Sequence, residues 1–492
     1  MLRITLKKTF GDRAKSLGIA GVILLMLAGC ATMGPHYVPP ATSLNPTWNS
    51  ELKGGLTVEK TSLQSLALWW TTLNDSELSL LIDRAVAGNL DLKKARARVR
   101  EARAQRGITK AGLFPTLDIT GSATWMRTDK DTGAGRSSEL YSASFDAGWE
   151  LDIFGGVRRS VEAAEADLQA SQEDLYDVLV SLLAEVALNY VEVRTRQAQI
   201  AATEANLTSQ SETFQLATWR QQAGLSDDLA VQQARYNLEN TKSLIPTLRA
   251  NLEEALNRIA VLLGEQPGKV HAELKKESPI PETPLKVAVG VPAEAIRHRP
   301  DVRRAERELA AQTARVGVAT ADLYPKFTFS GSIGLETLAL GNLSSGISTL
   351  LGIPRVTWPI FSGGSIRQRI EVQSALQEQS LIKYEATVLN AIEEVENVIT
   401  TYAEQQVRRD SLRFAEEAAR QAAALAQNKY EAGLTDFTGV LEAQRSLLSF
   451  QEQLAQSEGA VASNLIKLYK ALGGGWESLA GNEEASYKGR KE

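Results

Sequence analysis

The chain has 492 residues, of which 23% are charged and only 6% are aromatic, and its formal net charge at pH 7 is −5. The first sixteen residues carry five basic side chains against one acid, so their removal leaves −5 − 4 = −9. Such a charge balance argues against nucleic acid as a partner. The length allows several domains or one very elongated one.

The residues that carry most enzyme chemistry are scarce. There is one cysteine, Cys30, and three histidines, His36, His271 and His298. These are too few for a Cys/His metal cluster or a Cys–His nucleophilic pair. Neither a glycine-rich phosphate loop between a strand and a helix nor a G-x-S-x-G elbow occurs. We predict no catalytic residue, no metal and no cofactor except a covalent lipid.

The N-terminus has the features of an export signal. Its first sixteen residues are basic, and a short apolar run follows over residues 17–27. That run is too short to cross a hydrocarbon core of about 30 Å as a helix, so it reads as the apolar part of a signal peptide.

The end of this segment resembles the bacterial lipobox. The small residues Ala28 and Gly29 suit a peptidase pocket, and the thiol of Cys30 is the nucleophile that accepts a diacylglyceryl group. We predict that Cys30 carries diacylglycerol and an N-acyl lipid. The resemblance implies the outer membrane, because Ala31 rather than Asp follows the cysteine. The alternative is an ordinary signal peptide with an incidental cysteine.

Two halves of the chain match at an offset near 209 positions. The matching motifs are Leu113-Phe114-Pro115 with Leu323-Tyr324-Pro325, Ile153-Phe154-Gly155-Gly156 with Ile360-Phe361-Ser362-Gly363, Ala223-Gly224-Leu225-Ser226 with Ala432-Gly433-Leu434-Thr435, and Leu263-Gly264 with Leu472-Gly473. Since the motifs keep their order and spacing, they indicate an internal two-fold repeat.

Each half is predicted to read helix, two strands, long helix, tight turn and return helix. The first helices run over about 75–112 and 292–323, and each is followed by a proline. The long helices run over about 158–223 and 365–432. At a rise of about 1.5 Å per residue, each long helix extends about 100 Å.

Apolar and polar residues alternate between these helices. Strict alternation covers residues 116–125, 141–152 and 327–336, while the run at about 347–360 changes phase at Pro354, as a β-bulge would cause. One face is apolar with aromatic residues, and the other is hydroxylic and acidic. This pattern and length predict a transmembrane β-barrel with a wet interior. The alternative is a soluble sheet packed on one face.

The return helices carry an apolar residue at every seventh position. The stripes are Val231, Leu238, Ile245, Leu252 and Ile259 in the first half, and Val440, Leu447, Leu454, Val461 and Leu468 in the second. A sustained heptad predicts left-handed coiled-coil packing, with a kink at Pro246.

A glycine turn precedes each return helix. Gly224 and Gly433 supply the left-handed residue that ends the long helix, and Ser226 and Thr435 are expected to cap the next helix. Each long helix and its return helix therefore form an αα-hairpin.

Four strands per chain force an assembly if the strands cross a membrane. An open sheet would leave bare backbone edges in lipid, and closed bacterial barrels start at eight strands. Two copies give eight strands with a filled interior, whereas three give twelve and leave an opening. The polar face favours three.

Several motifs are similar to those of the TolC-like outer-membrane efflux proteins, particularly the lipidated NodT/OprM-like subgroup. They are Gly34-Pro35, Tyr37-Val38-Pro39, Trp69-Trp70, Arg299-Pro300-Asp301-Val302-Arg303, Trp358-Pro359-Ile360-Phe361, Leu441-Glu442-Ala443-Gln444-Arg445 and Leu468-Tyr469-Lys470-Ala471-Leu472-Gly473-Gly474-Gly475-Trp476. The similarity covers nearly the whole chain after the signal.

The resemblance implies a mixed α and β fold. A homotrimeric transmembrane β-barrel, with four strands per chain, continues into a long periplasmic α-helical coiled-coil barrel. The implied segments are a signal peptide over 1–29, a lipid-anchored N-terminal and equatorial segment over 30–74, efflux repeats over 75–264 and 292–473, an equatorial linker over 265–291 and an equatorial tail over 474–492.

The implied function is a passive exit duct. The family is the outer-membrane channel of a tripartite pump, which takes small molecules from an inner-membrane RND-type transporter through a periplasmic membrane-fusion adaptor. Two alternatives belong to other classes: a periplasmic adaptor lipoprotein, which has one hairpin between soluble β-domains, and a type I protein-secretion duct, which usually lacks a lipobox. The exported substrate stays open.

Family roles carry over to two groups of residues. The adaptor-facing tips correspond to Gly224, Leu225, Ser226, Gly433, Leu434 and Thr435. The periplasmic gate corresponds to Glu442 and Arg445, with Glu where the subgroup often has Asp. The alternatives are glycines that only make the turn, and an i,i+3 surface ion pair that contributes about 0.3–0.5 kcal/mol.

Overall fold

A computed structural model describes residues 32–41, 44–59, 63–127, 129, 131, 135, 137–345 and 347–477. The predicted signal peptide, Cys30 and most of the predicted C-terminal tail lie outside these residues. No helix in the described part of the chain is both long enough and apolar enough to cross a membrane.

The fold mixes α and β and is mostly helical, in two compact units. The first half contains α4 (Leu90–Ala111), β2 (Thr116–Arg127), β3 (Ser137–Leu151), α5 (Gly156–Gln222) and α6 (Asp228–Leu262). The second half contains α9 (Pro300–Ala321), β5 (Lys326–Thr337), β6 (Ile347–Thr357), α10 (Ser365–Glu431) and α11 (Phe437–Ala471). Helix lengths are equal between the halves, at 22, 67 and 35 residues.

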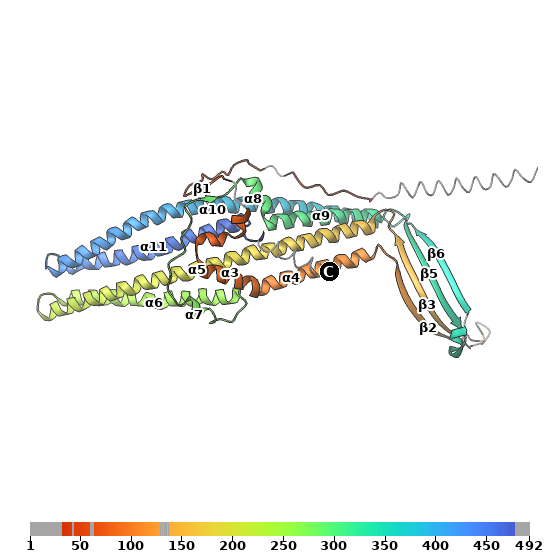
Figure 1. The fold of residues 1–492 in the computed structure, drawn as a ribbon, viewed down its shortest axis with the longest axis horizontal. Coiled ribbons are helices and arrows are strands. Elements are labelled where there is room, and N and C mark those ends of the chain that lie inside the picture. Colours follow the sequence, from red (N-terminus) through yellow and green to blue (C-terminus); the bar gives the residue numbers. More distant parts are fainter. Residues whose placement is uncertain are drawn as a thin grey trace, which may run out of the picture. The chain divides into compact units, whose positions relative to one another are not determined.

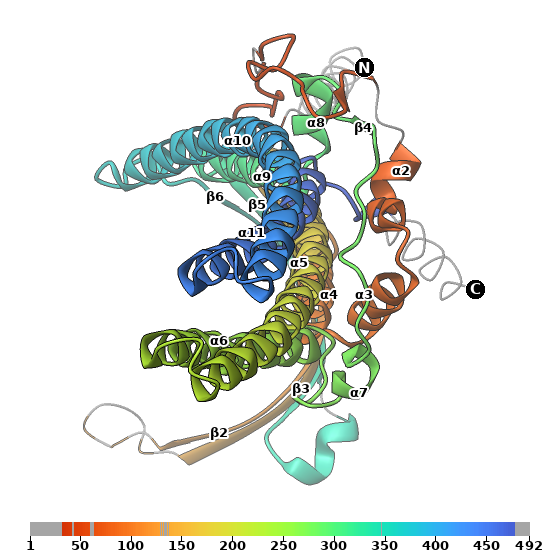
Figure 2. The same cartoon turned by 90° about the vertical axis from the view of Figure 1, so that its left-hand side faces the viewer.

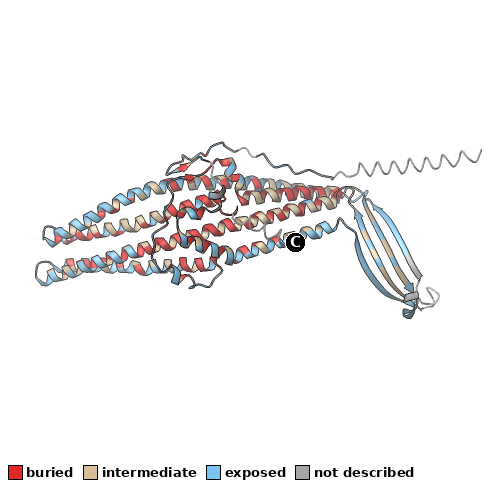
Figure 3. Cartoon of the chain, in the orientation of Figure 1, coloured by how far each residue is buried: buried red, intermediate tan, exposed pale blue. Residues whose placement is uncertain are grey.

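The first unit comprises residues 1–41, 98–171 and 304–385 and holds an antiparallel sheet of order β2-β3-β5-β6 (Figure 1). Its register aligns the apolar residues Ile119, Phe145, Ile333 and Leu350 in one row across the sheet. The next row holds Asp118, Asp146, Ser332 and Leu351 on the opposite face. Figure 3 shows that much of this sheet is exposed in a single chain.

The bulge expected at Pro354 is wrong. Pairing between β5 and β6 continues without a slip, with Pro354 opposite Phe329. The apolar pattern changed because Leu351 and Ile353 lie on the face that is polar elsewhere. Proline is tolerated there because β6 is an edge strand, so one row of its backbone N–H groups has no strand partner in the described part of the chain.

Helices extend from the sheet in the order α4, α5, α9, α10. Ion pairs mark each contact within this unit: Arg106 with Glu165, Arg315 with Asp167 (2.5 Å) and Lys383 with Glu308 (2.6 Å). Helices α4 and α10 therefore end the helical layer, just as β2 and β6 end the sheet.

The helices expected before the strands are each broken once. The first is split into α3 (Ser76–Gly88) and α4 by Asn89, whose side chain accepts from Leu92 N (2.9 Å) and donates to Leu262 O (2.8 Å). The second is split into α8 (Pro292–His298) and α9 at Arg299. Arg299 has ψ 127° because the following Pro300 excludes the helical conformation.

The second unit comprises residues 42–97, 172–303 and 386–492 and contains two helical hairpins, α5–α6 and α10–α11 (Figure 2). Ile245, Ile259, Val440, Val461 and Leu468 of the expected stripes are buried, and the other stripe residues are half-buried. Near the start of α6, smaller or polar side chains are the buried ones: Ala230, Ala234, Asn237 and Thr241.

Short elements surround these hairpins. They are β1 (Leu56–Thr57), α2 (Leu63–Ala67), η1 (Trp69–Leu73), α7 (His271–Leu274) and β4 (Val287–Ala288), while η2 (Leu340–Ser345) follows β5 in the first unit. Strand β1 pairs in parallel with β4, and Trp69 stacks on Tyr469 of α11 with ring centroids 5.4 Å apart. Segments far apart in sequence thus pack around the middle of the hairpins.

Candidate functional site

The hairpin tips are built by the same turn in both halves. Gly224 and Gly433 have φ of +70° and +74°, a conformation that glycine adopts without a steric penalty. The next backbone N–H reaches back five residues, from Leu225 to Arg220 O and from Leu434 to Lys429 O, at 2.8 Å in each case. This Schellman geometry ends each long helix.

The capping residues of the return helices differ from the expectation. Asp227 accepts from Ala230 N (3.2 Å) and Asp436 accepts from Gly439 N (3.3 Å), so each carboxylate is the N-cap. Ser226 and Thr435 instead lie in the turn, one residue earlier. An acid at the N-cap adds a favourable interaction with the helix dipole to the hydrogen bond.

Two leucines project from the tips. Leu225 is 71% exposed and Leu434 is 77% exposed. These two exposed apolar side chains lie on turns whose flanking helix ends are capped.

A buried cluster joins the two hairpins just behind these turns. Its members come from the two long helices and the two return helices: Ala217, Ala230, Ala234, Tyr430, Phe437, Val440 and Leu441. Arg220 of α5 donates to Tyr430 O of α10 (2.9 Å) and lies over the Tyr430 ring. Burial raises the pKa of the Tyr430 hydroxyl, and Arg220 and Ser226 partly offset this rise. The hairpins therefore end as one packed bundle.

The predicted gate residues do not pair with each other. Arg445 Nε donates to Asn237 Oδ1 of α6 (2.9 Å), and the guanidinium lies 5.0 Å from the centre of the Tyr236 ring. Glu442 is exposed, and the described residues contain no ion pair between it and Arg445. Arg445 thus links the two return helices, and the i,i+3 ion pair is not formed.

Sequence reasoning missed Asn237 and Tyr236. The offset of 209 offers the signal, because Tyr236 occupies in the first half the position that Arg445 occupies in the second. Two equivalent positions on neighbouring return helices thus face each other.

Buried polar side chains follow the helices away from the tips. Gln444 donates to Thr213 (2.9 Å), and Asn206 donates to Gln451 (2.6 Å). Gln210 is only 2% exposed, and neither of its amide atoms has a hydrogen-bond partner among the described residues. Such a seam is less stable than an apolar core, since an unpartnered buried amide costs about 1–3 kcal/mol.

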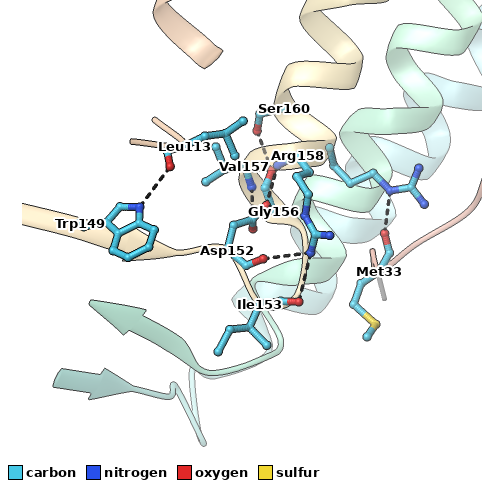
Figure 4. Close-up of polar contacts among 10 residues, drawn as sticks. Met33, Leu113, Trp149, Asp152, Ile153, Gly156, Val157, Arg158 and Ser160 are labelled. Carbon is cyan, nitrogen blue, oxygen red and sulfur yellow. Dashed lines mark hydrogen bonds and ion pairs between the residues drawn. The ribbon is translucent and has the colours of Figure 1, made fainter. Parts of the chain in front are cut away.

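The turn from β3 into α5 is held by one carboxylate (Figure 4). Asp152 accepts from the backbone N–H groups of Val157 (3.0 Å) and Arg158 (2.7 Å). Arg158 returns its guanidinium to the same carboxylate and to the carbonyls of Asp152 and Ile153. The first turn of α5 is therefore fixed to the end of β3.

The N-terminal segment is attached to this turn. Met33 N donates to Phe154 O (3.1 Å), and the buried Arg159 donates from Nε to Met33 O (3.0 Å). Gly34, at φ +87°, lies against Gly317 of α9 so closely that a Cβ on Gly34 would be 2.4 Å from the Gly317 Cα. We call residues 32–41 the strap. It covers the line where α5 meets α9.

Two tryptophans at strand ends make equivalent bonds. Trp149 Nε1 donates to Leu113 O (3.1 Å), as Figure 4 shows, and Trp358 Nε1 donates to Leu323 O (3.0 Å). Each bond ties the helix–strand turn of one hairpin to the far strand of that hairpin. Both rings stay exposed in a single chain.

A family model for outer membrane efflux proteins matches residues 81–265 and 291–474. The chain belongs to the outer membrane efflux protein family. It is 34% identical to "Nodulation protein T" of Rhizobium leguminosarum bv. trifolii, covering 93% of this chain and 97% of the relative. It is 31% identical to "Solvent efflux pump outer membrane protein SrpC" of Pseudomonas putida, covering 92% and 97%.

Solved structures agree with this assignment. A structure of the outer-membrane channel OprN has a TM-score of 0.84 and 34% identity, covering 91% of this chain and all of that one. The resemblance drawn from the motifs is therefore confirmed at the level of the family and of its function. This outer membrane efflux protein is an efflux channel.

Proposed function

We propose that three copies of this efflux protein close into a ring, with a twelve-stranded transmembrane β-barrel joined to an α-helical barrel. The sheet carries the proposal, because β2 and β6 end it and their outer edges lack strand partners in the described part of the chain. Unpaired backbone groups cost several kcal/mol each in lipid, so another chain must cover both edges.

The two edges belong to different strands, so one copy's β6 would pair with the next copy's β2. Such a head-to-tail contact closes into a ring when the rotation between copies is right. Two copies would give eight strands, whose interior side chains fill, whereas three leave a channel. The hydroxyls of Thr120 and Ser144, on one face in a shared row, suit a wet interior.

Lipid on Cys30 would anchor each copy at the end of its sheet. Cys30 precedes Thr32 by two residues, and two extended residues reach at most about 7 Å. The strap fixes Met33 to Phe154 O, beside the turn that leaves β3. The acyl chains would thus enter the membrane near the level of the exposed Trp149 and Trp358 rings.

The channel would be the passive outer part of a tripartite pump. The exposed Leu225 and Leu434 at the tips suit an apolar contact with a periplasmic membrane-fusion adaptor, which would connect to an inner-membrane RND-type transporter. One relative is named for solvent efflux and another for nodulation, so we propose small molecules as substrates without choosing a class.

Glu442 and Arg445 would close the periplasmic end. Arg445 holds α11 to α6 within one chain, and the exposed Glu442, one turn earlier on α11, would meet a neighbouring copy. Replacing both by alanine removes these charge-assisted contacts. We expect higher single-channel conductance in planar bilayers and sensitivity of cells to vancomycin. Unchanged conductance at normal trimer levels would remove both residues from the gate.

Mass in detergent tests the ring. We expect the mass of three chains together with mixed α and β circular dichroism. A monodisperse monomer with the same spectrum would refute the ring, because the edges of its sheet would have no partner.

Labelling tests the anchor separately. Cys30→Ser should abolish incorporation of labelled palmitate while the protein still inserts, since the barrel buries far more apolar surface than acyl chains do. Wild-type incorporation in Cys30→Ser would refute the anchor alone.

A further inference from the structure

An aromatic contact joins the two halves of the chain at the end of the sheet. Phe154, in the turn from β3 to α5, stacks on Tyr324, in the turn from α9 to β5, with ring centroids 4.7 Å apart and planes 22° apart. The strands that these turns continue, β3 and β5, are neighbours in the sheet. The stack therefore lies at the end of the sheet where β3 ends and its neighbour β5 begins.

The two turn motifs that form this stack each occur once more, in the other half of the chain. Phe361 occupies the turn from β6 to α10, in Ile360-Phe361-Ser362-Gly363, as Phe154 does in Ile153-Phe154-Gly155-Gly156. Phe114 occupies the turn from α4 to β2, in Leu113-Phe114-Pro115, as Tyr324 does in Leu323-Tyr324-Pro325. Yet Phe361 is 91% exposed and Phe114 is 61% exposed, whereas Phe154 and Tyr324 are half-buried.

Phe361 and Phe114 cannot stack within one chain. Their strands, β6 and β2, lie at opposite ends of the sheet order, with β3 and β5 between them. At about 4.8 Å between neighbouring strands, three intervals separate the two edges by about 14 Å. Only another copy can bring a β2 turn next to this β6 turn.

A pair of glycines shows the same difference. Gly317 of α9 lies at the contact with α5, where an added Cβ would be 2.9 Å from Arg159 Nε and from Met33 O. Gly107 of α4 occupies the equivalent position before Leu113-Phe114-Pro115, and nothing lies within 4 Å of an added Cβ there. Glycine in a helix interior costs about 0.5–1 kcal/mol relative to alanine, so an open Gly107 has no structural reason within one chain.

We propose that Phe361 of one copy stacks on Phe114 of the next copy, with Gly107 at the close approach between that copy's α4 and the α10 that follows Phe361. The contact between subunits thus repeats the contact of Phe154, Tyr324 and Gly317 inside each chain. This proposal rests on the proposed ring, in which β6 of one copy pairs with β2 of the next. In this proposal, the aromatic stack specifies that β6 of one copy pairs with β2 of the next.

Thiol cross-linking tests the stack. Phe361→Cys and Phe114→Cys are combined in one chain, and the purified full-length protein is treated with a short bifunctional thiol reagent. We expect covalent dimers and trimers on denaturing gels, in yield about equal to that of the in-chain bridge in a protein carrying Phe154→Cys and Tyr324→Cys. That second protein calibrates the reagent, because its two sites stack at 4.7 Å.

Matched variants control for chance collisions and for Cys30. Each single cysteine variant should give no covalent trimer. Phe361→Cys combined with Leu338→Cys should give none either, because Leu338 is also an exposed apolar residue but follows the far end of β5.

The possible outcomes separate this contact from the ring itself. A trimeric mass with an efficient in-chain bridge, but no bridge between Phe361→Cys and Phe114→Cys, would overturn the stack and leave the ring standing. A monomeric mass would overturn both. Rapid modification of Phe361→Cys by a water-soluble maleimide in the intact trimer would also overturn the stack, because a stacked position is covered.

Discussion

The two turns that lead from a strand into a long helix differ in what holds them. At the first turn, Asp152 caps α5, Arg158 closes the turn, and the strap covers the helix behind it. At the second turn, Pro359 stands at the motif position of Asp152, and Ile360 and Phe361 are 87% and 91% exposed. The first turn thus has a carboxylate cap and an aromatic stack within one chain, whereas the described residues show neither of these two contacts at the second turn.

This contrast separates a turn that is stabilised within its own chain from one that a neighbouring copy would cover in the proposed ring. Exposure of apolar side chains to water is unfavourable. Gly363 and Gly364, which follow Phe361, restrict the backbone of the second turn only weakly. In this outer membrane efflux protein, the first junction is thus held by contacts within its own chain. The other is available to a neighbour, as the proposed ring requires.

The largest expected effect concerns equivalent glycines in two helices beside these turns, Gly317 of α9 and Gly107 of α4. Gly317→Ala places a Cβ 2.9 Å from Arg159 Nε and Met33 O, so the strap must move. We expect a loss of about 1–3 kcal/mol in the free energy of unfolding, as for other overpacked sites. Urea titration measures the loss, and limited proteolysis should show earlier cleavage within the strap.

Gly107→Ala is the matched control. Its Cβ meets nothing within 4 Å in one chain, so the strap should resist protease as in the wild type. Equal protease sensitivity in the two variants would break the comparison, because the strap would then not depend on the approach of Gly34 to Gly317.

The next effect concerns the cap of α5. Asp152→Ala removes the acceptor of two backbone N–H groups and the partner of Arg158, and we expect a loss of about 1–2 kcal/mol. Pro359→Ala, at the equivalent motif position before α10, should change stability by less than about 0.5 kcal/mol because Pro359 is exposed. Urea titration of both variants measures the difference. Similar losses would mean that α10 is capped as firmly as α5.

Periodicity in the sequence was enough to predict the strands and the long helices. Alternation over residues 116–125 and 327–336 became β2 and β5, and the glycine turns ended α5 and α10 within a residue of the expected positions. Both signals are local, since each depends on residues a few positions apart. They also bring Gly224 and Gly433 into equivalent turns.

Contacts between distant segments could not be predicted in this way. Arg445 pairs with Asn237, 208 positions away, and Arg159 binds the strap 126 positions earlier. The apolar periodicity indicates neither pairing, although the repeat offset of 209 relates Arg445 to Tyr236, the neighbour of Asn237. The break at Asn89 belongs to the same class, because its side chain bonds to Leu262 as well as to its own helix. By contrast, the break before Pro300 follows from the sequence, since proline restricts the preceding residue, but the expectation of one helix over about 292–323 missed it.

The next effect is a pH-dependent contribution to stability from a contact between the N-terminal region and α10 in the second unit. Glu396 of α10 accepts from Asn49 N (2.6 Å) and Ser50 N (2.9 Å). Burial alone would raise the pKa of Glu396, but the hydrogen bonds from Ser50 and Asn49 outweigh it and lower the pKa. Glu396→Gln should therefore cost about 1 kcal/mol at neutral pH.

The sign follows from the lowered pKa. The charged carboxylate stabilises the fold above the unfolded pKa of about 4.3, and this contribution disappears as the pH falls through the lower folded pKa. Unfolding curves of wild type and Glu396→Gln should thus separate at pH 7 and converge in acid. The exposed Glu393→Gln on the same helix is the matched control and should change stability at pH 7 by less than about 0.5 kcal/mol. A difference independent of pH would contradict the assignment to the charged carboxylate.

The smallest expected effect concerns a hydrogen bond that both halves of the chain form in the same way. Trp149→Phe and Trp358→Phe each remove one indole-to-carbonyl hydrogen bond, of 3.1 Å and 3.0 Å, and keep an aromatic ring at the strand end. A hydrogen bond contributes about 0.5–1.5 kcal/mol net, and exposure places both near the lower end. Since each bond lies within one hairpin, β2–β3 or β5–β6, neither depends on the strap or on a neighbouring copy. We expect equal losses for the two variants in urea titrations, and a double variant with their sum, because independent sites add. A clearly larger loss for Trp358→Phe would mean that the Trp358–Leu323 hydrogen bond also stabilises the exposed second turn, which contains Phe361. The two turns would then differ in the hydrogen bonds at their strand ends as well.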